Sequence, residues 1–311
     1  MFCLFENVHN DRQFLATTGL DKADFKALLT KFEQAVSRAP EQRPGPEGCL
    51  TSLACELFFG LFYLKTYPTF DVLGLSFGIE GPAAQKRLMP ILAYLRETLR
   101  ENKHLPARSL EQVDAIEQIL SELEQQAGDQ VWIDGTERES SRPKDDESQK
   151  ARYSGKKRYH TYKNLLLTTF SRLIIFLSPT VSGSVHDYKM LKTALQPGLD
   201  WFKGLQVWLD LGFQGFAHDY ECGQAHQPIK KPRKSKRNPD PHLTEEQKEY
   251  NRQISKVRVL VENVICGLKR YQILVQRFRN RSIDFADQVM EICAGLWNFR
   301  VSCKSAKITA A

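Results

Sequence analysis

Two short apolar runs with nearly the same letters each lead to an aspartate, and they constrain the fold of this chain more than any other feature. Val-Trp-Ile precedes Asp134 and Gly135, and Val-Trp-Leu precedes Asp210. β-Branched and aromatic residues in so short a run favour a buried strand. Both strands would then end on a carboxylate, as strands at functional sites often do.

A third acid, Glu262, falls in a segment with helical periodicity. Its apolar positions are Val257, Leu260, Val261, Val264, Ile265 and Leu268, which predicts a helix with one buried face. Each of the three acids also has an ordinary interpretation. Asp134 and Asp210 would suit turns beside glycines, and Glu262 could pair with Arg258 one helical turn away.

The three acids together fit a metal site. Mg²⁺ prefers oxygen ligands and keeps several waters, so a few carboxylates suffice. Two such ions about 4 Å apart can support an in-line displacement at phosphorus. The strand, strand, helix order of these acids therefore favours phosphoryl transfer over three unrelated structural roles.

Length and composition predict one large or two ordinary domains with packed cores, since the chain has 311 residues and is 41% hydrophobic. Its longest apolar stretch is too short for a membrane helix, and its N-terminus does not resemble a secretory signal. We therefore expect a cytoplasmic protein without membrane association. Seven cysteines without a CxxC pair indicate reduced thiols rather than disulfides or zinc.

The charge is unevenly distributed along the chain. The net charge is +7, yet residues 111–147 carry twelve acids and three bases, which leaves +16 for the rest. Such an excess suits a polyanion such as nucleic acid if it gathers on one face.

The first part of the chain, residues 1–127, is predicted to be a helical DNA-binding domain. Residues 51–99 have the pattern of a helix-turn-helix, with Gly78 in the turn and Pro82 opening the second helix. Gln85, Lys86 and Arg87 would be exposed on that helix and could reach base edges and phosphates. A helical hairpin with a merely solvated polar face is the alternative. An acidic linker helix is expected over 110–126.

Residues 128–303 are predicted to form an α/β domain, followed by a tail at 304–311. Strands are expected at 131–134, 159–170, 173–177 and 207–210. Helices are expected at 188–195, 244–271 and 285–301. This is the element order of a ribonuclease-H-like fold, a mixed sheet with flanking helices, in which the first and fourth strands are neighbours and would bring Asp134 close to Asp210.

Several ordered motifs carry a family resemblance. They are Trp132-Ile-Asp-Gly-Thr-Glu-Arg138, Arg142-Pro-Lys144, Tyr153-Ser-Gly-Lys-Lys-Arg-Tyr-His-Thr-Tyr-Lys163, Gly183-Ser-Val-His-Asp187, Leu209-Asp-Leu-Gly-Phe-Gln-Gly215, and Arg258-Val-Leu-Val-Glu262 with Lys269-Arg270. The chain resembles bacterial insertion-sequence transposases of the DDE superfamily, in the branch related to Harbinger elements with a fused helix-turn-helix.

The resemblance implies which residues form the active site. Asp134, Asp210 and Glu262 would be the catalytic triad and would bind two Mg²⁺ ions, with Mn²⁺ as a substitute. Arg258 and Lys269 would complete a signature whose tyrosine position is Ser255 here. The resemblance also places a His-Asp pair, His186 and Asp187, near the active centre. Alternatively Asp187 caps the following helix and His186 is packed or solvated.

The resemblance further implies the reaction and the partners. The protein would bind the terminal inverted repeats of its element as a homodimer or larger assembly, hydrolyse phosphodiester bonds and transfer the 3′-OH ends to target DNA on the bacterial nucleoid. One alternative is a non-catalytic DNA-binding regulator or domesticated transposase. Another is a ribonuclease-H-like nuclease that performs no strand transfer.

Basic segments between the acids are candidates for contact with double-stranded DNA, because lysine and arginine bind phosphates with little sequence preference. A basic loop is expected over 228–242. The candidates are Lys156, Lys157 and Arg158, then Lys230, Lys231, Arg233, Lys234, Lys236 and Arg237 in that loop, and Arg270 after the catalytic helix. The alternative is that these charges are only solvated.

Overall fold

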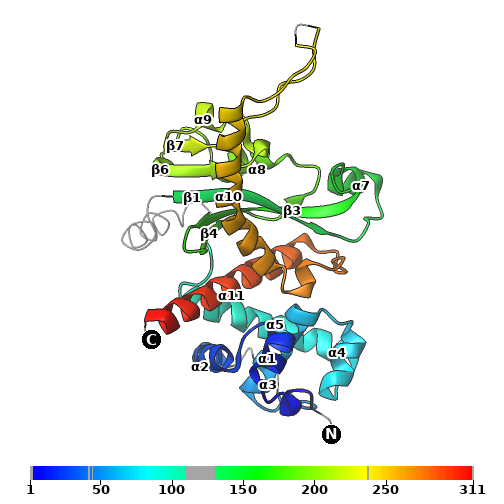
Figure 1. Cartoon of the computed structure of the whole chain (residues 1–311). Helices are drawn as coiled ribbons and strands as arrows, with labels where there is room; N and C mark the ends of the chain where they lie inside the picture. Colours follow the sequence, from blue (N-terminus) through cyan, green and yellow to red (C-terminus); the bar gives the residue numbers. More distant parts are fainter. Residues whose placement is uncertain (1–2, 41–42, 44, 109–129, 237, 310–311) are drawn as a thin grey trace. The chain divides into compact units, whose positions relative to one another are not determined.

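The computed structural model describes residues 3–40, 43, 45–108, 130–236 and 238–309 (Figure 1). The chain divides into two compact units. The first gathers 1–106, 138–141 and 267–311, and the second comprises 107–137 and 142–266. The expected linker helix 110–126 and the candidate Arg237 lie outside the described residues.

The first unit is helical. Its elements are η1 (Phe5–Asn7), α1 (Asp11–Thr18), α2 (Lys22–Arg38), α3 (Leu53–Thr66), α4 (Phe70–Phe77), α5 (Gly81–Glu101), η5 (Gln272–Leu274) and α11 (Ile283–Thr309). Thr69 caps α4 by accepting a hydrogen bond from Val72 N–H, and Gly78 ends that helix in the left-handed conformation, with φ +66°. The two predicted helices joined at Gly78 are therefore confirmed, whereas their role in DNA binding stays a prediction.

Residues 267–303 group with the N-terminal helices, although we expected them in the catalytic domain. The physical reason is the packing of α11 on α5. There Arg96 Nε donates to Glu291 Oε2 at 2.5 Å, and the Glu291 side chain is buried. Trp297 also packs directly against the backbone of Gly267, where a Cβ atom would lie 1.9 Å from the ring.

The second unit is built on a mixed sheet. Its strands are β1 (Gln130–Glu139), β2 (Tyr153–Ser154), β3 (Tyr159–Thr169), β4 (Ile174–Leu177), β5 (Val181–Ser182), β6 (Phe202–Leu209) and β7 (Cys222–His226). They follow the order β2-β3-β1-β6-β7, with β4 and β5 also paired to β3. β1, β6 and β7 run parallel, and β3 is antiparallel to β2, β4 and β5.

The register of β1 and β6 pairs Trp132 with Trp208 and Ile133 with Leu209. The prediction that these two strands are neighbours is therefore confirmed. β1 nevertheless extends to Glu139, so Asp134 lies within the strand rather than at its end. It still follows the last pair with β6, because that pairing stops at Ile133.

The two faces of the sheet carry different side chains, as strand alternation requires. Val131, Ile133, Val207 and Leu209 join the hydrophobic core, together with Met190 and Leu191. Trp132, Trp208 and His226 alternate with these core residues and form a stacked row across three strands. Their ring centroids are 4.8 and 4.0 Å apart.

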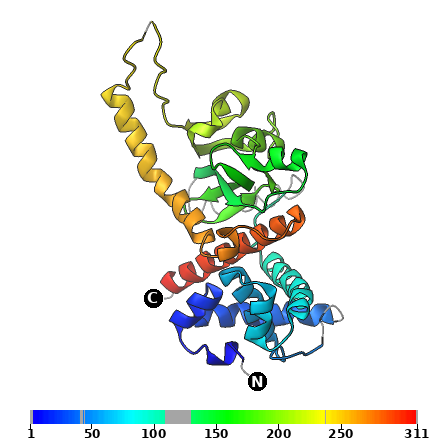
Figure 2. The ribbon, with the colours of Figure 1, turned by 90° about the vertical axis from the view of Figure 1, so that its right-hand side faces the viewer.

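The helical elements of the second unit are α7 (Asp146–Arg152), α8 (Asp187–Ala194), η4 (Leu211–Phe213), α9 (Phe216–Asp219) and α10 (Glu245–Leu268). Helix α7 and strand β7 are absent from our predictions. Figure 2 shows α10 standing beside the sheet. Among the described helices, none has the length and apolar character that a membrane crossing requires.

Residues 227–244 form an irregular segment between β7 and α10, here called the basic arm. Its base is fixed by Asn251 of α10, which exchanges two hydrogen bonds with the backbone of Ile229, at 2.8 and 3.0 Å. Near its tip, Ser235 and Asn238 exchange backbone hydrogen bonds. The arm projects beyond the sheet at the N-terminal end of α10 (Figures 1 and 2), which agrees with the extended loop predicted over 228–242.

Candidate active site

Two of the predicted acids meet at one edge of the parallel strands. Asp134 and Asp210 each come one residue after the paired Ile133 and Leu209. The Oδ1 of Asp134 accepts a hydrogen bond from Gly135 N–H at 2.7 Å, and the Oδ1 of Asp210 accepts one from Leu211 N–H at 2.7 Å. These contacts hold both carboxylates against their own backbone at the point where the strand pairing stops.

Burial raises the pKa of Asp134 to about 6, well above its ordinary value of 3.8. The Gly135 N–H and the charge of Arg258 oppose this rise, whereas the charges of Asp210 and Asp187 add to it. A strongly shifted carboxyl with charged neighbours is a common property of functional sites. Three charged groups of the second unit, Arg258, Asp210 and Asp187, therefore act on the Asp134 carboxyl.

Arg258 connects the second and third predicted acids. Its Nη1 lies 3.2 Å from Asp210 Oδ1, and its Nε lies 3.3 Å from Glu262 Oε1, one turn along α10. The Asp210 side chain is 32% exposed and that of Glu262 is 54% exposed. The ion pair that we considered for Arg258 and Glu262 is thus present, and it extends to Asp210.

Arg258 links Asp210 to Glu262, but the three acids do not form one ligand cluster. Across the residues that the structure describes, no group of three or more His, Cys, Asp or Glu side chains converges as metal ligands do. The Arg258 guanidinium lies between Asp210 and Glu262, where it balances both charges. The donor set is nonetheless composed of carboxylate oxygens alone, and that set suits a hard divalent cation.

Asp187 is a fourth carboxylate at the same edge. A Cβ atom built on Gly135 would lie 3.4 Å from its Cγ, and one built on Gly212 would lie 3.6 Å from its Oδ2. Asp187 thus lies beside the backbone of Gly135, which follows Asp134, and of Gly212, which comes two residues after Asp210. It is the first residue of α8 and not its cap, because the cap is His186, whose Nδ1 accepts from Tyr188 N–H at 3.3 Å.

Lys163 holds Asp187 in place and was not among our candidates. Its Nζ lies 3.2 Å from Asp187 Oδ1 and donates to Val185 O at 3.0 Å. Lys163 sits in β3, beside the buried Tyr162 and Asn164. A lone lysine between buried residues of a strand is the signal that could have identified it, because buried charges require partners.

Two other predicted site residues are placed differently from our expectation. α10 ends at Leu268, so Lys269 follows the helix and does not continue the face of Glu262. Arg270 is directed inward within the first unit, where its Nε donates to Gly267 O at 3.0 Å and its guanidinium lies over the Trp297 ring.

The predicted DNA contacts of α5 are only partly exposed. Gln85 and Lys86 are exposed as expected. The expectation that Arg87 is exposed is wrong, because its side chain is buried and its Nε lies 2.7 Å from Glu47 Oε2. Arg87 lies on the inner face of the helix, where its buried guanidinium needs a partner of opposite charge.

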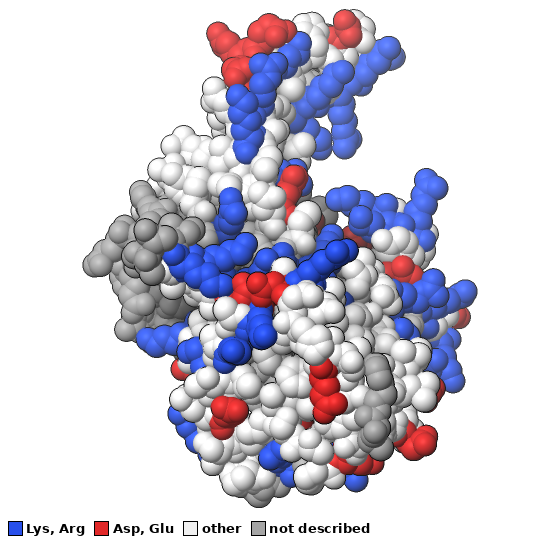
Figure 3. Space-filling model, turned by 60° about the horizontal axis from the view of Figure 1, so that its bottom comes forward, with Lys and Arg blue, Asp and Glu red and all other residues white. Residues whose placement is uncertain are grey.

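The remaining basic candidates that the structure describes are exposed. Lys156, Lys157 and Arg158 form the tight turn between β2 and β3. The described bases of the arm are Lys230, Lys231, Arg233, Lys234 and Lys236, all exposed. Figure 3 shows Lys and Arg side chains, with Asp and Glu side chains among them, on the segment that projects at the top of the view.

Comparisons with known proteins find a DDE endonuclease family and a probable transposase. Residues 133–298 match the family described as DDE superfamily endonuclease. The chain is also 27% identical over 296 residues to a protein of Microchaete diplosiphon named "Probable transposase for insertion sequence element IS702", and the match covers 94% of this chain and 96% of that protein. No solved structure matches this chain.

Proposed function

The chain belongs to the DDE superfamily of endonucleases, and we propose that it is the transposase of an insertion sequence, in the branch related to Harbinger elements. It binds the ends of its element, hydrolyses a phosphodiester bond at each end and transfers the released 3′-OH to target DNA. The relative from Microchaete diplosiphon, which aligns along nearly the whole chain, supports the step from endonuclease to transposase.

The observation that carries the proposal is the arrangement of acids around Arg258. Asp134 and Asp210 follow paired positions of adjacent parallel strands, and Arg258 links Asp210 to Glu262. These three acids come from segments far apart in the sequence, so their association depends on the fold. We propose that they are the catalytic residues and that the sheet with its helices is a ribonuclease-H-like domain.

Asp134, Asp210 and Glu262 would hold two Mg²⁺ ions, or Mn²⁺ in their place. When bound, such ions activate the attacking oxygen and stabilise the leaving oxygen. The protein's own groups prepare the site. Gly135 and Leu211 fix the two aspartates through their N–H groups, and the raised pKa of Asp134 keeps part of that carboxyl protonated near pH 6. Arg258 supplies positive charge beside two of the acids.

DNA contacts are proposed on both units. α4 and α5 would act as a helix-turn-helix, with Gln85 and Lys86 directed to the duplex. The turn with Lys156, Lys157 and Arg158 and the basic arm would bind phosphates of the element ends or the target. Two ends must be joined at one target, which implies at least a homodimer. We propose that the protein works on the nucleoid in the bacterial cytoplasm.

A cleavage assay on the DNA that flanks this gene tests the proposal. We would compare wild type, Glu262→Gln and the control Glu246→Gln, an exposed acid of the same helix, at equal salt and Mg²⁺. Wild type and the control should nick the element ends and join them to a plasmid target. Glu262→Gln should bind the same DNA without cutting it.

Each alternative gives a different result. Binding without cleavage by all three proteins would indicate a regulator or a domesticated copy. Cleavage without joined products would indicate a nuclease that performs no strand transfer. Full activity of Glu262→Gln would remove Glu262 from the catalytic set.

A further inference from the structure

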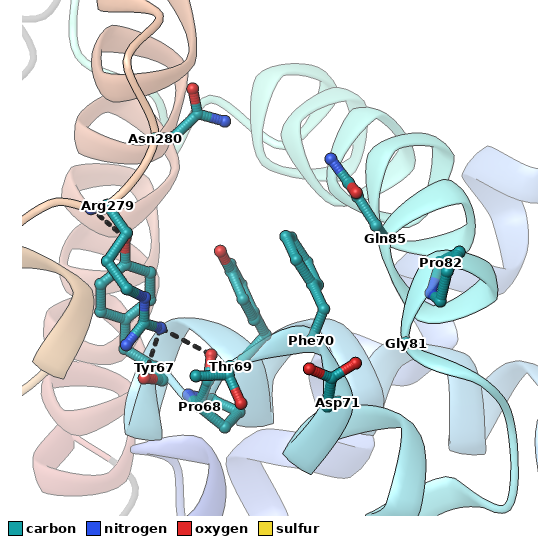
Figure 4. A pocket seen from close by; sticks show the side chains of 11 residues that line it. Tyr67, Pro68, Thr69, Phe70, Asp71, Gly81, Pro82, Gln85, Arg279 and Asn280 are labelled. Atoms are coloured by element: carbon teal, nitrogen blue, oxygen red, sulfur yellow. Dashed lines mark hydrogen bonds between the residues drawn. The ribbon is translucent and has the colours of Figure 1, made fainter.

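A cavity of about 530 Å³ lies in the first unit beside α3, α4 and α5. Arg279 and Asn280 form one part of its lining, and Phe70 and Gln85 form another (Figure 4). Its size falls in the range of small-molecule binding sites. None of its lining residues belongs to the catalytic set, so the cavity requires a separate explanation.

We infer that this cavity receives one nucleobase turned out of the DNA stack. The inference rests on the proposed function, because it assigns a role to the helices that we propose to bind DNA. It goes beyond that function by giving the protein a second mode of DNA recognition, in addition to contacts made along an intact duplex.

The aromatic lining provides a flat apolar surface. Tyr63 and Phe70 are stacked with their rings 5.5 Å apart and only 6° from parallel. Tyr63 is buried, whereas Phe70 is partly exposed at the cavity. A partly exposed ring of this kind can stack on any base, since every base has a π-face.

Polar groups around that surface match the edge of a base. The side chains of Gln85 and Asn280 line the cavity from different segments (Figure 4), and carboxamides can form paired hydrogen bonds with base edges. Asp71 also lines the cavity. Its carboxylate can accept hydrogen bonds from base amino or imino groups but repels phosphate, so the chemistry favours a base over the DNA backbone.

The wall of the cavity is held in a strained backbone conformation. Tyr67 ends α3 with φ +48°, a left-handed geometry that is unusual for a bulky residue. Arg279 secures it, because its guanidinium lies 3.8 Å from the Tyr67 ring centre and donates to Tyr67 O and Pro68 O at 2.8 and 2.6 Å. Strain retained in this way is common at ligand sites.

The test uses three duplexes of one sequence: fully paired, with a single unpaired central nucleotide, and with an abasic residue at that position. Wild type should bind the duplex with the unpaired base about 5- to 150-fold more tightly than the abasic duplex, the range expected for base stacking. Phe70→Ala and Phe70→Leu should remove that preference. Leu75→Ala, an exposed residue of α4 that does not line the cavity, should retain it.

Phe70→Leu keeps an apolar contact for Tyr63. Thermal melting of each variant shows whether the substitution has impaired folding.

Equal binding of wild type to the unpaired-base and abasic duplexes overturns the inference. The proposed function still stands in that case if the flanking ends are cleaved. Failure to bind all three duplexes, together with failure to cleave, overturns both. An undiminished preference in both Phe70 variants also overturns the inference.

Discussion

Burial makes the charged form of the Asp134 carboxyl costly to the folded protein. Its pKa rises from 3.8 to about 6, so between these values the folded protein keeps a proton that the unfolded chain releases. The free energy of unfolding therefore falls as the pH rises through this window. Above about pH 6 the full cost is present, and below about pH 4 it is absent.

Asp134→Asn should consequently stabilise the metal-free protein while removing a carboxylate that we propose to be catalytic. At pH 8 the gain should be no more than about 3 kcal/mol, from the size of the pKa shift, and it should disappear below pH 4. Thermal melts in EDTA across this range measure it. Asp145→Asn is the control, because hydrogen bonds from Ser148 lower the pKa of that exposed helix cap and no gain is expected. A lower melting temperature for Asp134→Asn at pH 8 would contradict this account.

Lys163 should matter for catalysis through Asp187. Lys163→Met leaves Asp187 without the Nζ at 3.2 Å and should lower the cleavage rate about 10- to 100-fold, the range seen when side chains that orient groups around a metal site lose their partners. Duplex binding should change little, and Lys163→Arg should recover part of the rate. Lys192→Met is the matched control, since Lys192 pairs with Asp219 at 3.4 Å. An unchanged rate in Lys163→Met would exclude the positioning role.

Among the secondary structure elements, the basic arm combines a fixed base with an exposed charged tip. Replacing Lys230, Lys231, Arg233, Lys234 and Lys236 by Gln should weaken DNA binding and reduce its dependence on salt. The slope of log K against log salt is negative, and if all five bases contact phosphates it should become shallower by about 4.5. Binding measured at several salt concentrations gives this slope.

The control variant replaces five exposed bases of the first unit by Gln, namely Arg12, Lys22, Lys26, Lys103 and Lys304. These substitutions should make the slope shallower by less than those of the arm. Equal losses for the two variants would show that only the total charge matters and that the arm has no particular role.

Much of the element pattern follows from local sequence. Asp21 caps α2 and Thr69 caps α4, and the periodicity around Glu262 predicts α10. Helix α7 was missed although Asp145 caps it and bases occupy its last turn. β7 was missed because Cys-Gly-Gln-Ala-His lacks an apolar run, and its pairing with β6 is a long-range property.

Of the candidate site, the sequence predicts the neighbouring strands β1 and β6, whose pairing brings Asp134 and Asp210 to matching positions. Both aspartates are candidates because both follow similar apolar runs. The contact between Lys163 and Asp187 depends on the position of β3 relative to α8, which no local pattern specifies. Similarly, the burial of Arg87 follows from the position of Glu47, forty residues earlier in the chain.

The whole molecule is proposed to act as at least a dimer, because two element ends must be joined at one target. Mixing equal amounts of wild type and Glu262→Gln before adding DNA, with the total protein kept equal to that of the wild-type reaction, tests this. If each protomer cuts one end, products with both ends joined should fall to about one quarter of the wild-type amount. A fall to one half would indicate that one protomer processes both ends.

The stacked row of Trp132, Trp208 and His226 gives the β1–β6 register an optical signature. The two indole rings have centroids 4.8 Å apart with planes inclined by 23°, close enough for their electronic transitions to couple. A shift of one strand by a single residue would turn one indole to the opposite face of the sheet and uncouple the pair. The circular dichroism of these two tryptophans would therefore report whether Asp134 and Asp210 are aligned, without any DNA or metal being present.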